Sequence, residues 1–130
     1  LPTFSIFEQN EELKTNKEWQ NFSFVKINEL IKENIVFVDI TADWCATCQF
    51  NKVNVLNSDK IKNLFATNKV ILVRGDWTKP NKNINKFLNN YNRFGIPFNA
   101  FFSSSYPDGL ILSELLSEKE INNAINIIKK

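Results

Sequence analysis

The chain has 130 residues, of which 16 are basic and 14 acidic, and 43% of it is hydrophobic. That length predicts one domain, and the apolar content is sufficient for a hydrophobic core. No run of like charges points to a nucleic-acid partner, and no apolar run approaches the roughly 20 residues that span a bilayer. The chain has no histidine, so a Cys–His or Ser–His catalytic pair is excluded.

The first 18 residues are polar and lack clear periodicity, which favours an N-terminal arm or linker (1–18) before a domain over residues 19–130. A short strand is expected near residues 19–22. Ser23 is placed to cap a helix whose apolar residues recur at helical spacing. The run at residues 35–40 is rich in β-branched residues and predicts a buried strand.

Helices and strands alternate after this strand. Helical spacing resumes after Cys45 and again after Ser58, and a second buried strand is predicted at residues 70–73. Another helix is predicted to begin just after Pro80, with Gly95 as the residue that stops it.

The C-terminal third predicts two antiparallel strands and a helix. A strand at residues 100–102 and another at 110–112 would be joined by a type I turn at residues 106–109. Ser117 and Glu120 have the spacing of a capping box that opens the last helix. The whole order, α-β-α-α-β-α-β-β-α, predicts an α/β fold with a central mixed sheet and helices on both faces.

Cys45 and Cys48 form a Cys-x-x-Cys pair between a predicted strand and a predicted helix. Free N–H groups at a helix start stabilise a thiolate, so Cys45 is the predicted nucleophile and Cys48 the resolving thiol. Alone, such a pair could also be half a metal site or a structural disulfide. The chain lacks the further thiolates or histidines that a metal site needs, and so short a loop gives a disulfide little entropic benefit. Redox chemistry is therefore favoured, without metal or other cofactor.

Asp39 lies within the apolar strand, six residues before Cys45. One interpretation is a carboxylate at a strand end that faces solvent. Its apolar neighbours favour burial instead, and a buried carboxylate is costly without a partner or a role. We therefore expect Asp39 to accept the proton of Cys48 during resolution, and its charge to raise the thiol pKa values.

A proline and two aromatic residues lie beside the expected site. Ile96-Pro97 precedes the strand that begins near Phe98, and since only about 5–6% of X–Pro bonds are cis, these residues alone favour trans. Trp44 precedes the nucleophile. Trp44 and Phe98 either belong to the core or line a shallow apolar groove that docks a partner's peptide segment.

At residues 38–48 the chain resembles the active-site segment of the thioredoxin superfamily, and Gly95-Ile96-Pro97 resembles the cis-proline loop of that family. More narrowly, residues 42–48, 75–78 and 106–109 resemble the C-terminal periplasmic domain of DsbD and its ScsB-type relatives. DsbD is the thiol:disulfide interchange protein of the bacterial inner membrane. The resemblance covers about residues 19–128.

This resemblance implies a thioredoxin fold, with Cys45 as an exposed nucleophile and Cys48 as its buried partner. Asp39 would be the family's buried acid. Pro97 would be cis, which would place the backbone of Ile96-Pro97 beside the cysteines to pair with a substrate strand and would exclude metal.

The resemblance also implies a physiological setting. The chain would be a periplasmic domain, tethered to the inner membrane, that takes electrons from a membrane domain's cysteine pair. Such shuttling of electrons between partners favours a monomer. It would pass them to thioredoxin-like proteins such as disulfide isomerases and cytochrome c maturation factors. The alternatives are a free-standing thioredoxin-like reductase and a non-catalytic binding module. One position departs from the family, because Lys52 stands where DsbD relatives carry a glutamate; a cation there would favour the thiolate.

Overall fold

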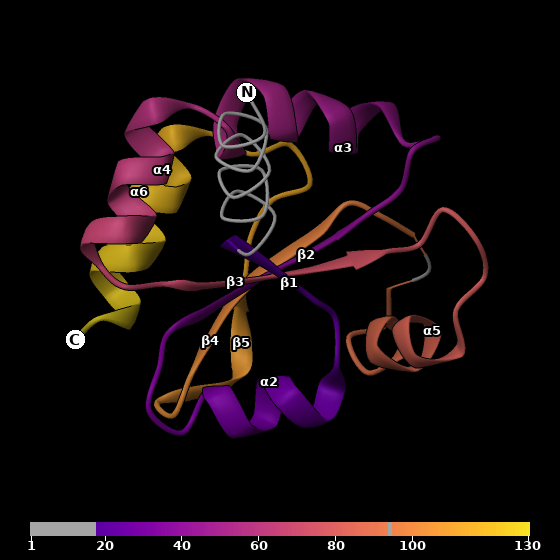
Figure 1. Cartoon of the computed structure of the whole chain (residues 1–130), viewed down its shortest axis with the longest axis horizontal. Coiled ribbons are helices and arrows are strands. Elements are labelled where there is room, and N and C mark those ends of the chain that lie inside the picture. Colours follow the sequence, from indigo (N-terminus) through magenta and orange to yellow (C-terminus); the bar gives the residue numbers. More distant parts are fainter. Residues whose placement is uncertain (1–17, 94) are drawn as a thin grey trace, which may run out of the picture.

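The computed structural model describes residues 18–93 and 95–130 (Figure 1). The arm predicted at residues 1–18 lies, except for its last residue, outside the described residues. The strands are β1 (Trp19–Asn21), β2 (Val36–Thr41), β3 (Ile71–Asp76), β4 (Phe98–Ser103) and β5 (Tyr106–Ile111). The helices are α2 (Phe24–Leu30), α3 (Ala46–Asn51), α4 (Asp59–Thr67), α5 (Lys82–Asn89) and α6 (Glu118–Ile128), and a π-helical segment, η1 (Lys52–Leu56), continues α3.

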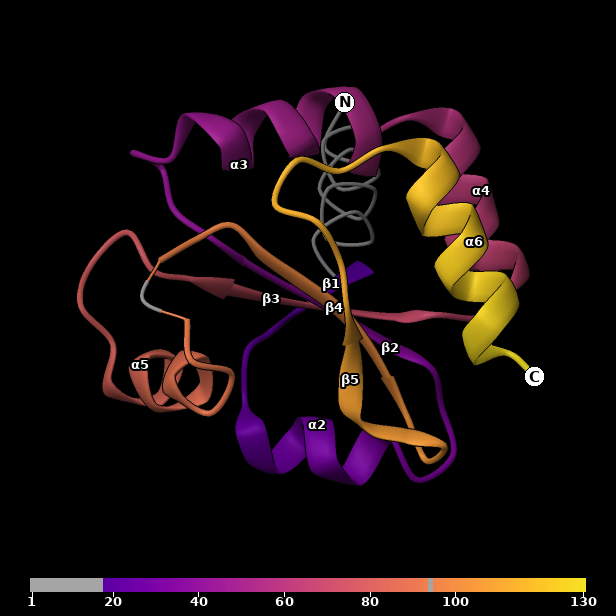
Figure 2. The ribbon, with the colours of Figure 1, turned by 180° about the vertical axis from the view of Figure 1, so that it is seen from behind.

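The five strands form one mixed sheet in the order β1-β3-β2-β4-β5. β3 pairs in parallel with β1 and β2, whereas β4 runs antiparallel to β2 and β5 antiparallel to β4. Helices α2 and α5 cover one face, and α3, η1, α4 and α6 cover the other (Figures 1 and 2). The predicted α/β architecture, with a central mixed sheet and helices on both faces, is confirmed.

Side-chain caps explain where the helices begin. In four of them a residue before the first turn accepts a hydrogen bond from the backbone N–H three residues on, which satisfies one of the unpaired donors of a helix start. These capping residues are Ser23, Ser58, Asn81 and Ser117. All four helix starts were predicted from the sequence.

The prediction of a turn at residues 106–109 is wrong. The hairpin turns at Ser104-Ser105, and residues 106–109 already belong to β5. Pairing is irregular between Phe101 and Ser103, and Gly109 has a φ of +88°. The Pro-Asp-Gly signal therefore marks a bulge in an edge strand, where such residues also fit.

Gly95 does not stop α5, contrary to expectation. The helix ends at Asn89, and a turn follows in which Asn92 takes the left-handed conformation with a φ of +55°. Asparagine tolerates this conformation better than most residues, so no glycine is required there.

The alternation of β2 decides which face each of its residues supplies. Every residue of β2 is buried. Val36, Val38 and Ile40 pack in the core cluster under α2 and α5, whereas Phe37 packs in the cluster under α4 and α6. Since side chains alternate along a strand, Asp39 points to the same face as Phe37, under the layer that contains α3. Among the described helices, none is long and apolar enough to cross a membrane.

Candidate active site

The two cysteines lie where β2 passes into α3. Cys45 caps the helix with an extended backbone (φ −93°, ψ 104°), and it forms a disulfide with Cys48, whose Cα lies 5.2 Å away. The backbone N–H of Cys48 donates to Sγ of Cys45 at 3.2 Å. An N–H aimed at this sulfur from the first helical turn stabilises negative charge on it, which suits Cys45 as the nucleophile.

The two sulfurs differ in access, although less than the resemblance implied. Cys45 is 7% exposed and Cys48 is 2% exposed. Cys45 is thus the more accessible of the pair, but an incoming partner disulfide can reach only a small part of it. This restricted access favours a partner segment that docks against the surrounding surface.

The loop before β4 forms the other side of the site. The Ile96–Pro97 bond is cis, as the resemblance implied, and Pro97 is buried. The half-buried Ile96 packs against the small cluster made by Ala42, Cys45 and Cys48. The backbone of this loop therefore runs beside the disulfide.

Of the two aromatic residues expected to line a groove, the structure places only Trp44 at the surface. Trp44 is 62% exposed beside the disulfide, whereas Phe98 is 1% exposed. The Phe98 ring packs 5.4 Å from that of Phe87 and 5.3 Å from that of Tyr91, between centroids. The expectation that Phe98 lines a docking groove is therefore corrected: its ring is part of the core under α5.

The loop after β3 holds the segment that precedes Cys45, a contact that the sequence analysis missed. The Thr78 hydroxyl accepts a hydrogen bond from the Asp43 backbone N–H at 2.9 Å, and the Thr78 carbonyl accepts one from the Trp44 indole at 3.2 Å. Asp76 in turn accepts hydrogen bonds from the backbone and hydroxyl of Thr78, and these lower the pKa of the Asp76 carboxyl. We call this arrangement of Asp76 and Thr78 the latch.

A signal for the latch was present in the sequence. β2 and β3 are parallel neighbours, so their carboxyl ends meet at one edge of the sheet. An Asp-x-Thr whose aspartate ends a strand can form an Asx-type turn, in which the carboxylate accepts a hydrogen bond from the backbone N–H two residues on. From the sequence, residues 75–78 were noted only for their resemblance to the DsbD domain.

Asp39 is buried, as predicted, but not alone. It is 3% exposed, and its Oδ2 accepts a hydrogen bond from Nε of Arg74 at 2.9 Å. Burial raises the pKa of the Asp39 carboxyl, while the cations of Arg74 and, more weakly, Lys52 oppose that rise. The sequence analysis named no partner for Asp39. The positive charge of Arg74, on the strand next to that of Asp39, was the signal that could have identified one.

Lys52 lies at the start of η1, one helical turn after Cys48, and is partly buried. Its charge acts on both Asp39 and Asp76. The departure from the family noted in the sequence thus adds a cation whose charge lowers the pKa of both carboxyls. Within residues 18–93 and 95–130, no group of three or more His, Cys, Asp or Glu side chains is arranged to hold a metal ion.

A Cys-x-x-Cys disulfide at a helix start, a cis-proline loop beside it and a central mixed sheet define a thiol–disulfide oxidoreductase. A family model described as thioredoxin-like matches residues 32–104, which is more than half of the chain. The chain therefore belongs to the thioredoxin-like family.

Solved structures give the same fold. A mutant thioredoxin from Halobacterium salinarum is 16% identical with a TM-score of 0.63, covering 88% of this chain and 93% of that one. A thioredoxin from Thermus thermophilus is 14% identical with a TM-score of 0.64, covering 86% and 88%. A chain from the complex of ferredoxin:thioredoxin reductase and thioredoxin f2 is 13% identical with a TM-score of 0.57, covering 88% and 97%. No curated protein matches the sequence.

Proposed function

We propose that the chain reduces disulfides in partner proteins by dithiol–disulfide exchange through Cys45 and Cys48. The observation that carries this proposal is the hydrogen bond from the Cys48 N–H to Sγ of Cys45, because it prepares one sulfur of the pair as a thiolate. Burial of Cys48 in the same cluster keeps the second sulfur within reach of the first.

The exchange proceeds in two displacements. In the reduced protein, the Cys45 thiolate attacks one sulfur of the partner's disulfide, which forms a mixed disulfide and releases the partner's other sulfur as a thiolate. Cys48 then loses its proton and attacks Sγ of Cys45, which re-forms the intramolecular disulfide and releases the partner's second thiolate. The partner gains two electrons and the Cys45–Cys48 pair loses them.

Asp39 is the proposed acceptor of the Cys48 proton. Its carboxylate lies on the face of β2 that α3 covers, and burial raises the pKa of this carboxyl above its ordinary value. A carboxylate exposed to water would be a weaker base, so the buried position suits the task.

The proposed docking surface consists of Trp44 on one side of the disulfide and the Ile96–Pro97 loop on the other. Trp44 offers a large exposed ring that the latch holds in place, so little conformational entropy is lost when a partner binds it. The backbone at the cis Ile96–Pro97 bond, just before β4, lies beside Cys45 and is the proposed place for a partner segment to pair.

The finer proposal is a reductant of the DsbD type. Electrons would come from a cysteine pair in a membrane domain and go to periplasmic thioredoxin-like proteins, such as disulfide isomerases or cytochrome c maturation factors. In support, two of the segments that carry the DsbD resemblance, residues 42–45 and 75–78, bind each other through the latch. A neighbour of the same fold comes from a complex of a thioredoxin with its reductase, a donor–acceptor pairing of this general kind.

Single-cysteine variants test the exchange. The Cys48→Ser variant, mixed with a disulfide-containing protein, should accumulate a mixed disulfide through Cys45, because the resolving thiol is absent. The Cys45→Ser variant should trap none and should have no reductase activity. Both are measured by mass spectrometry without reductant, with the unmodified protein as control. Equal trapping by both variants, or none by either, would contradict the proposal and favour a binding module.

The direction of electron flow needs a second measurement. Equilibration of the Cys45–Cys48 pair against a thiol buffer gives its reduction potential. A value near that of thioredoxin, about −270 mV, supports a reductant, whereas a value near that of DsbA, about −120 mV, would make the chain an oxidant.

A further inference from the structure

We propose that Asn51 is a positioning residue for disulfide exchange, because it ties the helix that carries Cys48 to the loop between β5 and α6. We call this loop, residues 112–117, the α6 loop. The inference deepens the proposed function and rests on the proposed exchange at Cys45 and Cys48. It names the contact that keeps Cys48 in place after the disulfide has opened.

Asn51 is an amide in a buried position, with 1% of its surface exposed. Its Nδ2 donates a hydrogen bond to the carbonyl oxygen of Glu114 at 2.8 Å, and its Oδ1 accepts one from the backbone N–H of Leu116 at 3.0 Å. Both ends of the amide thus bind the backbone of one loop, 63 and 65 residues further along the chain. Because a buried polar group without a partner is costly, these two bonds fix the helix and the loop relative to each other.

The anchor lies one helical turn from the resolving cysteine. Asn51 follows Cys48 by three residues and Val55 follows Asn51 by four, so the three side chains share one face of the helical segment. This face is buried, with exposed fractions of 2%, 1% and 4% for Cys48, Asn51 and Val55. Val55 packs in the core cluster under α4 and α6, whereas Asn51 holds the same face by hydrogen bonds.

The helix changes its geometry directly after Asn51. α3 ends at this residue and the π-helical η1 begins at Lys52, whose carbonyl accepts a hydrogen bond from the N–H of Asn57, five residues on. Single π-helical turns within helices often lie at functional sites. α3 has six residues, and a helix this short depends on tertiary contacts for its stability. The two bonds of Asn51 are such contacts, at the junction of the two segments.

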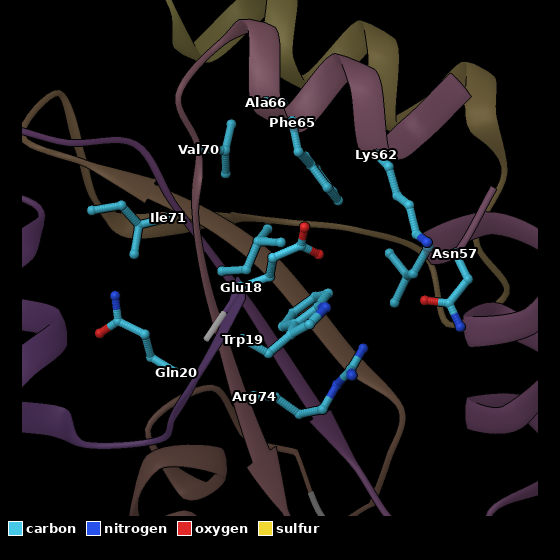
Figure 3. Close-up of a pocket in the computed structure, with 12 residues that line it drawn as sticks. Glu18, Trp19, Gln20, Asn57, Lys62, Phe65, Ala66, Val70, Ile71 and Arg74 are labelled. Carbon is cyan, nitrogen blue, oxygen red and sulfur yellow. The ribbon is translucent and has the colours of Figure 1, made fainter. Parts of the chain in front are cut away.

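Packing holds η1 less completely on the side toward β1. Leu56 and Asn57 line a pocket of about 500 Å³ together with residues of β1, β3 and α4, and Figure 3 shows Asn57 on one side of it. Protein interiors are otherwise close-packed, so a pocket of this size interrupts the support of the segment there. The hydrogen bonds of Asn51 to the α6 loop therefore supply a hold that packing toward β1 does not.

The α6 loop is itself fixed, so it can serve as an anchor. The N–H of Leu112 donates to the carbonyl oxygen of Asn99 on β4 at 2.9 Å. Ser113 donates to Oε2 of Glu120 on α6, through its N–H at 3.0 Å and through its hydroxyl at 2.8 Å. Leu116 packs in the core cluster under α4 and α6. Through this loop, Asn51 connects the cysteine helix to the sheet and to α6.

The consequence concerns the second displacement. While the disulfide is closed, the S–S bond itself holds Cys48 beside Cys45. In the mixed disulfide that bond is open, and Cys48 attacks Sγ of Cys45 from a helix that non-covalent contacts alone hold. A misplacement of about 1 Å can slow a reaction about 100-fold, so an anchor one turn away favours resolution. The first displacement depends on Cys45, whose preceding segment the latch holds.

Acid-quenched time courses test this role. The reduced protein is mixed with a disulfide-containing protein, and mass spectrometry follows the mixed disulfide on Cys45 as it forms and decays. Asn51→Leu keeps a side chain of similar size but removes both the donor and the acceptor. We expect it to form the mixed disulfide at a rate within about twofold of that of the unmodified protein, and to resolve it about tenfold more slowly or slower still. The mixed disulfide should therefore accumulate.

Asn54→Leu is the matched control. Asn54 lies on η1 and is exposed, and its Nδ2 donates to the carbonyl oxygen of Phe50 at 3.1 Å, within the same helical segment. Both rates should equal those of the unmodified protein. Asn51→Ser keeps a hydroxyl that donates and accepts but reaches less far, so its resolution rate should fall between those of Asn51→Leu and the unmodified protein. Should Asn51→Leu fail to fold, Asn51→Ser supplies the same comparison.

Hydrogen exchange of the Leu116 amide tests the contact in the unmodified protein. The proposed anchor must persist when the disulfide opens, so this N–H should exchange slowly in both the oxidised and the reduced protein. Fast exchange in the reduced protein would overturn the inference without any substitution.

The kinetic outcomes are distinct. Formation and resolution that Asn51→Leu slows equally, or a resolution rate equal to that of Asn54→Leu, would overturn the role of Asn51 although exchange occurs. If the unmodified protein forms no mixed disulfide at all, the proposed function fails, and the inference fails with it.

Discussion

The indole Nε1 of Trp44 donates a hydrogen bond to the carbonyl oxygen of Thr78 at 3.2 Å, across 34 residues of sequence. Together with the bond from the Asp43 N–H to the Thr78 hydroxyl, it fixes the segment before the nucleophile to the loop after β3. The position of Cys45 at the helix start therefore depends on a second loop, and not on α3 alone.

Loss of the latch hydroxyl should slow exchange. Thr78→Val removes the acceptor for the Asp43 N–H and a donor to Asp76, each worth about 1 kcal/mol. We expect a fall of several-fold in the rate of protein disulfide reduction, with about 2 kcal/mol lost from the free energy of unfolding. Thr67→Val, at the exposed end of α4, is the matched control and should change neither. A rate equal to that of the control would show that the latch does not position the site.

Removal of the exposed ring should weaken docking without harming the chemistry. Trp44→Ala deletes a side chain that is 62% exposed and typical of binding hot spots. We expect KM for a protein disulfide to rise about tenfold, which corresponds to about 1.4 kcal/mol of lost binding. The rate with a small aromatic disulfide should stay near that of the unmodified protein.

The control for this prediction is Val25→Ala, another exposed apolar residue, which lies on α2 at the opposite face of the sheet. It should leave both substrates unaffected. If Trp44→Ala slows the small disulfide as much as the protein disulfide, the ring acts on the chemistry and is not a docking surface.

The bulge in β5 predicts a large difference between two glycine substitutions. Gly109 has a φ of +88°, and a Cβ there would lie 2.7 Å from Cε1 of Phe102, a buried ring. Gly109→Ala should therefore lower the free energy of unfolding by at least about 1–3 kcal/mol. Gly95→Ala is the control, since a Cβ there would meet nothing within 4 Å. Equal stabilities of the two variants in denaturant unfolding would mean that the bulge tolerates a side chain.

The same bulge shows where sequence reasoning about the fold fails. Strand alternation and side-chain caps are local, so the helix starts and the order of elements followed from the sequence. A Pro-Asp-Gly sequence is equally local, but it suits both a turn and a bulge. Which of them forms is decided by the pairing of β5 with β4 and by the Phe102 ring, neither of which local chemistry specifies.

The residues of the site likewise fall into those that the local sequence predicts and those that it does not. Cys45, Cys48 and Asp39 were found because they lie within ten consecutive positions at one strand–helix junction. Arg74 and Thr78 were missed because they reach the site through the register of β2 against β3, from 35 residues away. Phe98 was misplaced although a signal existed: Phe98, Ala100 and Phe102 alternate on one face of β4, a pattern typical of a core-facing strand.

Asp39 and Asp76 should affect stability with opposite dependence on pH. Burial raises the pKa of Asp39 above its ordinary value of 3.8, so between 3.8 and that raised pKa the folded protein binds the proton more tightly. The contribution of Asp39 to the free energy of unfolding is fully present below pH 3.8 and is lost as the pH rises through the pKa of the folded state. The hydrogen bonds of Thr78 lower the pKa of Asp76, so its contribution is present above 3.8 and is lost as the pH falls through its folded pKa.

Two amide variants separate these effects. Asp39→Asn cannot titrate, so the free energy of unfolding of the unmodified protein, minus that of this variant, should become more negative as the pH rises above about 4. For Asp76→Asn the same difference should be constant above about pH 4 and shrink only below it, by a small amount because Asp76 is exposed. Urea unfolding over a range of pH measures both. A difference for Asp39→Asn that grows more positive with rising pH would mean that the Arg74 ion pair outweighs burial, and that Asp39 is too weak a base to accept the Cys48 proton near neutrality.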